Sequence, residues 1–181
     1  MDFFEKPLSS ERIFDGKIIG VRKDTVELQD GKKTFREVVE HSGGVCVAAL
    51  DDDGNMLFVR QFRYPNNSVI LEIPAGKLNP GEDHYECGKR ELEEETGCLC
   101  SVYEHIATIY PSPAYLGEII HVYFACGLTQ SEQKLDEGEF LEVERIPLEK
   151  AFEMVMNDEI FDAKTQIAVL KVKAMKDKGL I

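Results

Sequence analysis

A short acidic segment contains the residues whose types and spacing are best suited to chemistry. From Arg90 it reads RELEEETG and ends at Gly97. On a helix, Glu91, Glu94 and Glu95 stand at i, i+3 and i+4, so they share one face and repel one another by about 0.2–0.5 kcal/mol per pair. They also lie in the last turn, where the helix dipole favours cations. The pattern therefore costs stability unless a positive charge compensates for it.

Two interpretations of this acidic face are open on the segment alone. A run of charges is most often a solvated helix face. Oxygen ligands clustered on one rigid face are also what a hard cation such as Mg²⁺ requires, alongside waters and substrate phosphates. The surrounding sequence, which reads GKLNPGEDHYECGKRELEEETGC, favours the second interpretation. In it, charged residues and glycines recur at fixed intervals: Gly76, Glu82, Arg90, Glu91, Glu94, Glu95 and Gly97.

This segment resembles the Nudix box, and the chain is similar to the Nudix hydrolase family. The resemblance implies a Nudix fold of the α/β (α+β) class, an α/β/α sandwich around a mixed β-sheet, with an N-terminal antiparallel β-sheet extension. Gly76 and Gly97 are expected to be structural and Glu82 to hold the loop before the helix. The box ends at Cys98, where the family prefers Ile, Leu or Val, and a small apolar thiol should still pack there.

The resemblance also implies roles for residues of the box. Glu91, Glu94 and Glu95 correspond to ligands of Mg²⁺ or Mn²⁺, two or more ions being expected, and the carbonyl of Ala75 to a further ligand. Arg90 corresponds to the arginine that orients these carboxylates, and it counts with Glu94 among the catalytic residues. An ordinary helix ion pair between Arg90 and Glu94 at i+4 is compatible with that role.

Similarity extends beyond the box to the ADP-ribose pyrophosphatase subfamily. The stretch YPSPAYLGE places Pro113 fifteen residues after the end of the box, a spacing that marks this subfamily. The usual next residue is glycine, whereas this chain has Ala114. By this resemblance Pro113, Ala114 and Glu118 are substrate-binding positions. Arg36 and Arg63 match arginines that grip the substrate, although arginines on exposed strands commonly serve only solvation.

An acidic loop with the sequence LDEGEFLEV supplies the remaining candidates. In the subfamily one glutamate on this mobile loop is the catalytic base, and another nearby completes the metal site. Aligning the Glu-x-Glu pair assigns Glu137 as the base and Glu139 as a metal ligand, with a shift of two residues left open. The alternative is a solvated loop in an acidic protein.

The elements that must hold these residues follow from periodicity and turn signals. Apolar and polar residues alternate on both sides of Asp30-Gly31, which predicts a β-hairpin. Strand-rich sequence comes first and helices last, which predicts a mixed sheet packed between helices. Further strands are expected within 43–63, 68–78 and 100–128, and helices within 83–96, 147–158 and 163–178.

Two of these helices need apolar residues that pack on the sheet. In the middle helix, Tyr85 and Leu92 are the main candidates for burial, and the rest of that helix is poor in apolar residues. The last helix carries Ile167, Leu170 and Ala174 at helical spacing.

Composition excludes several classes of function. The chain has 181 residues, 43% of them hydrophobic, and a net charge of −13, which argues against binding to nucleic acid. No apolar run approaches the roughly 20 residues that a membrane span needs. The start lacks the pattern of a signal peptide, and the five cysteines are odd in number without a CxxC pair. We therefore expect a cytoplasmic protein with reduced cysteines and no membrane partner.

The sequence thus predicts an N-terminal β extension at 1–42, which by resemblance dimerises through exchange between subunits, and a Nudix hydrolase domain at 43–181. The expected activity is metal-dependent hydrolysis of ADP-ribose to AMP and ribose 5-phosphate in a homodimer. The alternatives are hydrolysis of another nucleoside diphosphate sugar, such as GDP-mannose, and a module that binds ADP-ribose without cleaving it.

Overall fold

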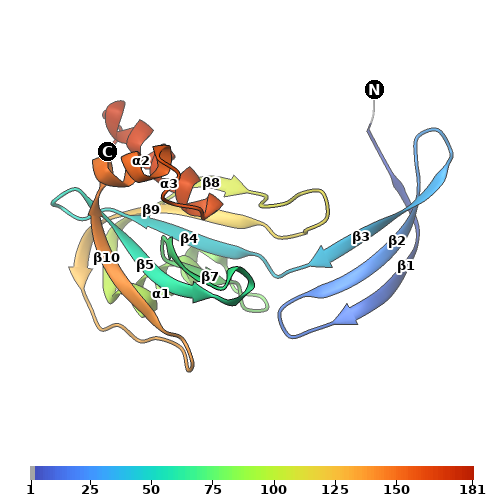
Figure 1. The fold of residues 1–181 in the computed structure, drawn as a ribbon, viewed down its shortest axis with the longest axis horizontal. Coiled ribbons are helices and arrows are strands. Elements are labelled where there is room, and N and C mark those ends of the chain that lie inside the picture. The colour runs from blue at the N-terminus through green and yellow to red at the C-terminus, as the bar shows by residue number, and fades with distance from the viewer. Residues whose placement is uncertain (1–2) are drawn as a thin grey trace. The chain divides into compact units, whose positions relative to one another are not determined.

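The structure, a computed structural model of the chain, describes residues 3–181, and these fall into two compact units. Unit 1 comprises Met1–Gly43 and Tyr110–Ile119, and unit 2 comprises Gly44–Ile109 and Ile120–Ile181. Each unit has β-structure of its own, as Figure 1 shows. Among the described residues, no helix has both the length and the apolar character that crossing a membrane requires.

Unit 2 contains a mixed sheet and a smaller antiparallel one. The strand order is β7-β4-β9-β8 in the first and β10-β5-β6 in the second. β4 and β9 are parallel while the other pairs are antiparallel, so the larger sheet is mixed, as the sequence predicts. The strands are β4 (Gly44–Ala49), β5 (Asn55–Arg63), β6 (Ser68–Glu72), β7 (Ala75–Lys77), β8 (Cys98–Ile109), β9 (Ile120–Gln130) and β10 (Leu141–Pro147), and a short 3₁₀ helix, η1 (Tyr64–Asn66), follows β5.

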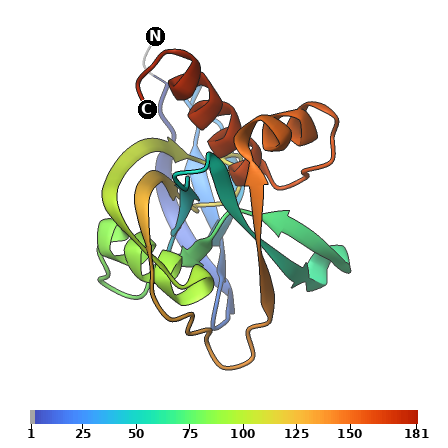
Figure 2. The ribbon, with the colours of Figure 1, turned by 90° about the vertical axis from the view of Figure 1, so that its left-hand side faces the viewer.

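Helices pack on both sides of these sheets (Figures 1 and 2). α1 (His84–Thr96) lies on one side, and α2 (Leu148–Met156) and α3 (Ala163–Asp177) lie on the other. Successive residues of β4 pack into different hydrophobic clusters of unit 2. Ala48 packs with α2 and α3, whereas Val47 packs with Leu92 of α1. The predicted α/β/α sandwich is confirmed.

α1 begins and ends at residues suited to the task. Asp83 caps its N-terminus by accepting a hydrogen bond from the backbone N–H of Tyr85 at 2.9 Å. Gly97 ends the helix with a φ of 65°, a left-handed conformation that glycine adopts at little cost. Leu92 is fully buried, as predicted.

The predicted burial of Tyr85 is wrong, since its exposed fraction is 39%. The reason is the close approach of α1 to the sheet at Gly88, where an added Cβ would lie 1.9 Å from the Tyr103 hydroxyl oxygen. Cys87 and Gly88 occupy the buried side there, and Tyr85 contacts the Tyr103 ring edge-on with centroids 5.0 Å apart. A glycine that costs helix stability is thus used for packing.

The apolar stripe predicted for α3 is also wrong, because Ile167 and Leu170 are 37% and 40% exposed. The rotation of the helix is set instead by Thr165, whose hydroxyl oxygen accepts the backbone N–H of Ile73 at 2.9 Å and so turns this side toward the sheet. The buried residues of α3 are Thr165, Ala168, Val169 and Val172.

Unit 1 is built on an antiparallel sheet with the order β1-β2-β3. Its strands are β1 (Lys6–Asp15), β2 (Gly20–Glu27) and β3 (Lys33–Glu40). The predicted hairpin is confirmed, because β2 and β3 pair in register around the Asp30-Gly31 turn. Gly31 has a φ of 81°, and its N–H donates to the carbonyl of Leu28 at 2.9 Å.

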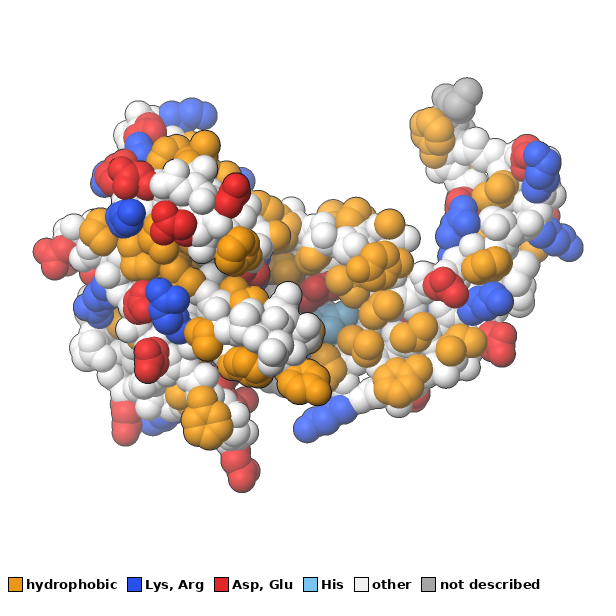
Figure 3. Space-filling model, in the orientation of Figure 1, with side chains coloured by type: hydrophobic (Ala, Val, Ile, Leu, Met, Phe, Trp, Pro, Cys, Tyr) orange, Lys and Arg blue, Asp and Glu red, His pale blue; other side chains and the backbone are white. Residues whose placement is uncertain are grey.

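This sheet buries little of its apolar surface. Val26 is the one large hydrophobic residue that is buried in the described part of unit 1. Figure 3 shows hydrophobic side chains beside charged ones on these strands. A small sheet needs a covered apolar face for independent stability, and this unit leaves several large apolar side chains exposed. They are Phe3, Phe4, Leu8, Ile13, Phe14, Ile18, Ile19 and Phe35.

Candidate active site

Arg90 is the centre of the polar contacts on α1. Its Nη1 lies 2.8 Å from Glu91 Oε1 and 2.7 Å from Glu94 Oε2. Its Nε and Nη2 donate to the two carboxylate oxygens of Glu82 at 2.9 and 3.2 Å. This pairing with Arg90 lowers the pKa of Glu82 to about 2, and the same hydrogen bonds raise the pKa of Arg90. One guanidinium therefore orients carboxylates that would otherwise repel one another.

Glu82 also holds the loop that precedes α1. Its Oε2 accepts the backbone N–H of Asn79 at 2.9 Å, and its own N–H donates to the Asn79 carbonyl at 3.0 Å. These contacts agree with the loop-holding role predicted for Glu82. Together with Arg90, they tie the start of the loop to the acidic face of the helix.

Glu91 and Glu95 are carboxylates in poorly solvated surroundings. Glu95 is 2% exposed, and its Oε2 accepts the backbone N–H of Ala75 at 3.0 Å. Burial, with the charges of Glu91 and Glu139 added, raises the pKa of Glu95 to about 8. Burial likewise raises the pKa of Glu91 to about 6. Since desolvation and like charge both disfavour the ionised forms, a cation beside them would be bound favourably.

Gly76 leaves room for the side chain of Glu91. A Cβ added at Gly76 would lie 1.9 Å from Glu91 Cδ and 2.0 Å from its Oε1. β7 and α1 therefore approach closely at this pair. Position 76 must lack a side chain if the Glu91 carboxylate is to stay where it is.

The acidic loop at 131–140 is tied to the C-terminal end of α1. The backbone N–H of Lys134 donates to the carbonyl of Glu94 at 2.9 Å, and Gln133 Nε2 donates to the carbonyl of Glu95 at 2.6 Å. Ser131 N–H donates to the carbonyl of Gly97 at 2.6 Å. The last backbone carbonyls of a helix have no partner within the helix, and here they anchor the loop. Two of them belong to Glu94 and Glu95, which are predicted metal ligands.

The two glutamates predicted to act from this loop differ in position. Glu139 is half-buried, and its Oε1 accepts a hydrogen bond from Gln61 Nε2 at 3.2 Å. It is close enough to Glu91 and Glu95 to raise the pKa of both. Glu137 is exposed and forms no hydrogen bond or ion pair with another described residue. The structure therefore brings Glu139, but not Glu137, toward the carboxylates of α1.

The donor set around α1 fits a hard divalent cation. Its members are carboxylate oxygens, the ligands that Mg²⁺ and Mn²⁺ prefer. In their present orientations, no three His, Cys, Asp or Glu side chains of residues 3–181 converge closely enough to hold a metal ion. The reason is that Glu94 is turned toward Arg90 and Glu95 toward the Ala75 N–H. Binding of an ion would compete with these contacts while relieving the repulsion.

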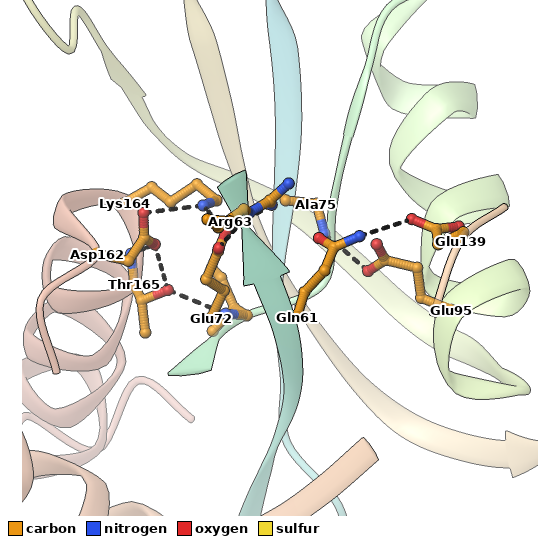
Figure 4. Close-up of polar contacts among 10 residues, drawn as sticks. Gln61, Arg63, Glu72, Ala75, Glu95, Glu139, Asp162, Lys164 and Thr165 are labelled. Atoms are coloured by element: carbon orange, nitrogen blue, oxygen red, sulfur yellow. Dashed lines mark hydrogen bonds and ion pairs between the residues drawn. The ribbon is translucent and has the colours of Figure 1, made fainter. Parts of the chain in front are cut away.

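Arg63, a predicted substrate-binding residue, also lies in this region. It forms a two-pronged ion pair with the buried Glu72, through Nε to Oε1 at 2.6 Å and Nη2 to Oε2 at 2.9 Å. Figure 4 shows Arg63 between Glu72 and the side on which Ala75 and Glu95 lie. The guanidinium is near enough to Glu95 for the two charges to favour each other's ionised form.

Sequence reasoning missed the residues that support Arg63 and Glu139. These are Gln61, Glu72, Asp162 and Lys164. A signal was present for Glu72, which follows the apolar run from Val69 to Leu71 and precedes Ile73. A charge buried in that way needs a partner, but the sequence does not indicate which residue supplies it.

The other predicted substrate-binding residues belong to unit 1. Arg36 pairs with Glu5, with Nε 3.0 Å from Oε2. The segment with Pro113 and Ala114 is anchored beside β3, because the N–H of Val39 donates to the Tyr115 carbonyl at 2.8 Å. A hollow of about 500 Å³ is lined in part by Arg36 and Ala114. Within the same unit, Glu118 Oε1 lies 3.3 Å from His41 Nδ1.

Comparison with known proteins identifies the family. A family described as the NUDIX domain matches residues 40–166, and a family described as the nucleoside diphosphate sugar hydrolase N-terminal domain matches residues 5–39. The chain therefore belongs to the Nudix family, and the resemblance inferred from the box is confirmed.

Relatives and a solved structure agree with this assignment. The chain is 45% identical over 167 residues to a Bacillus subtilis (strain 168) protein named ADP-ribose pyrophosphatase, covering 91% of this chain and 90% of that protein. It is 41% identical over 169 residues to a Bacillus methanolicus protein named methanol dehydrogenase activator, covering 92% and 91%. A crystal structure of an ADP compounds hydrolase shares the fold, with a TM-score of 0.85 at 22% identity over 98% of this chain and 97% of the other.

The contact between Gly76 and Glu91 leads to a prediction. Gly76→Ala should reduce hydrolysis by about tenfold or more, because the new Cβ displaces the Glu91 carboxylate. The melting temperature should change little, since the atoms that must move end a flexible side chain. Steady-state kinetics and thermal unfolding measure the two effects. Activity equal to that of the wild type would show that the position of Glu91 is unimportant.

Proposed function

We propose that this chain hydrolyses the pyrophosphate bond of ADP-ribose to AMP and ribose 5-phosphate by water attack on phosphorus, with Mg²⁺ or Mn²⁺ as the cofactor. The observation that carries the proposal is the grouping of the half-buried Glu91 and the buried Glu95 with Glu139 and the cation Arg63. The relative named ADP-ribose pyrophosphatase, 45% identical over nearly the whole chain, supports the choice of substrate.

Each group has a task in this reaction. Glu91, Glu94 and Glu95, with the carbonyl of Ala75, hold two or more divalent ions, which when bound neutralise the diphosphate and lower the pKa of the attacking water. Arg90 keeps the carboxylates of α1 oriented through its contacts with Glu91 and Glu94.

The acidic loop supplies the remaining groups at the reacting phosphorus. Glu139 completes the metal site, for which its proximity to Glu91 and Glu95 is the support. Glu137, exposed on the same loop, takes the proton of the attacking water. The hydrogen bonds that attach residues 131–134 to the end of α1 keep the loop beside the helix while its glutamates reach the substrate.

Substrate recognition is the task that we assign to the remaining predicted residues. Arg63 and Arg36 bind the phosphates or the terminal ribose, because a guanidinium presents a planar fork of donors to phosphate oxygens. Pro113, Ala114 and Glu118 contact the remainder of the substrate, and the hollow of unit 1 that Arg36 and Ala114 line supports their grouping.

The organisation of the chain is part of the proposal. Residues 1–42 form a β extension that exchanges between two subunits of a homodimer, and residues 43–181 form the hydrolase domain. The exposed apolar side chains of unit 1 support a partner surface there. The protein is cytoplasmic, which its free cysteines support. Light scattering should give twice the mass of one chain, and a monomer at micromolar concentration would refute the dimer.

Chromatographic product analysis tests the activity. The purified protein is incubated with ADP-ribose, GDP-mannose and NADH, each with Mg²⁺ and with a chelator. We expect AMP and ribose 5-phosphate from ADP-ribose, and no product with the chelator. Cleavage of GDP-mannose in place of ADP-ribose would establish the alternative substrate class. ADP-ribose binding without cleavage would establish the non-catalytic module instead.

A further inference from the structure

A chain of alternating charges, centred on the buried Glu72, connects Arg63 to the start of α3. Glu72 is 3% exposed and lies between two cations, Arg63 on one side and Lys164 on the other. The Lys164 side chain is 14% exposed, and its Nζ also lies 2.9 Å from Asp162 Oδ1. Two positive and two negative groups therefore balance in a region where an unpaired charge would be costly.

The lysine end of this chain is held by the cap of α3. Asp162 Oδ2 accepts the backbone N–H of Thr165 at 2.9 Å and its hydroxyl at 2.5 Å. The Thr165 oxygen in turn accepts the N–H of Ile73 at 2.9 Å. The N-terminus of α3 thus holds two consecutive residues where β6 ends: Glu72 by charge, as Figure 4 shows, and Ile73 by its backbone N–H.

At the other end of the chain, the guanidinium of Arg63 is hydrogen-bonded along one edge only. Nε and Nη2 of Arg63 donate to Glu72, whereas Nη1 has no hydrogen-bond partner among the described residues. Burial raises the pKa of Glu72, but the hydrogen bond from Arg63 and the charge of Lys164 outweigh it, so the net shift is downward. The carboxylate is therefore ionised at neutral pH and keeps the guanidinium plane fixed.

We propose that Lys164 is a positioning residue for the hydrolysis: through Glu72 it fixes the guanidinium of Arg63 so that the unpaired Nη1 edge faces the diphosphate of the substrate. This inference rests on the proposed function, in which Arg63 binds substrate. A guanidinium fixed before binding loses less freedom on binding, so the expected contribution is to substrate affinity. Lys164 itself contacts neither substrate nor metal.

A double-mutant cycle tests the inference. Lys164→Met keeps an unbranched side chain as far as Cε and removes the charged amine. We expect it to raise KM for ADP-ribose about tenfold while kcat changes by no more than about threefold. Arg63→Met should raise KM at least as much, and adding Lys164→Met to it should have no further effect, because Lys164 acts through Arg63. Lys164→Arg should restore most of the affinity.

Lys173→Met is the matched control. Lys173 lies on the same helix and forms ion pairs with Glu149 and Asp177, away from Arg63. The Lys173→Met substitution should change the thermal stability without changing KM for ADP-ribose. If Lys164→Met lowers the melting temperature and leaves KM unchanged, or if its effect adds fully to that of Arg63→Met, Lys164 has a structural role and the inference is wrong.

A readout without substrate separates this inference from the proposed function. The Nε–H proton of Arg63 should give a slowly exchanging NMR signal in the wild type, because it donates to a buried carboxylate. The signal should broaden or disappear in Lys164→Met and persist in Lys173→Met. If the wild type cleaves none of the nucleotides, the proposed function fails. An unchanged Arg63 signal in Lys164→Met would overturn the positioning role whatever the activity.

Discussion

Repulsion among carboxylates on and beside α1 is the constraint on which the rest of unit 2 depends. Glu95 is almost fully buried and Glu91 is poorly solvated, and both are close to the third carboxylate, Glu139. Hydrophobic packing does not require this arrangement, and the repulsion opposes it. Two arginines offset part of the cost, since Arg90 contacts Glu91 and Arg63 is near Glu95. The remaining negative charge makes a divalent cation the natural complement of the site.

The backbone around α1 holds these carboxylates in position despite their repulsion. Gly76 allows β7 to approach the Glu91 side chain, and the N–H of Ala75 holds Glu95. The carbonyls at the end of the helix accept hydrogen bonds from Gln133 and Lys134 rather than from water. The same hydrogen bonds therefore complete the helix end and place the acidic loop. The position of the loop is thereby coupled to the position of the carboxylates on α1.

Local rules predict part of this site and fail where distant segments meet. The spacing of Glu91, Glu94 and Glu95 and the glycine at 97 specify a helix with one acidic face, because both depend on residues within a few turns. The hairpin at Asp30-Gly31 is predictable for the same reason. The contact of Lys164 with Glu72 joins residues 92 apart in the sequence, and no local pattern indicates it. The rotation of α3 likewise depends on Thr165 reaching Ile73, which is why an apolar pattern alone selects the wrong face.

Calorimetric titration of Mn²⁺ tests most directly whether the carboxylates of α1 bind a divalent ion. The wild type should bind, and Glu91→Gln should bind at least about tenfold more weakly, because it removes a negative charge from a poorly solvated site. Glu93→Gln is the control on the same helix, since Glu93 accepts a hydrogen bond from the Ser131 hydroxyl, a bond that an amide oxygen can also accept. Its affinity should equal that of the wild type. Equal affinity in Glu91→Gln, or no binding by the wild type, would contradict the account.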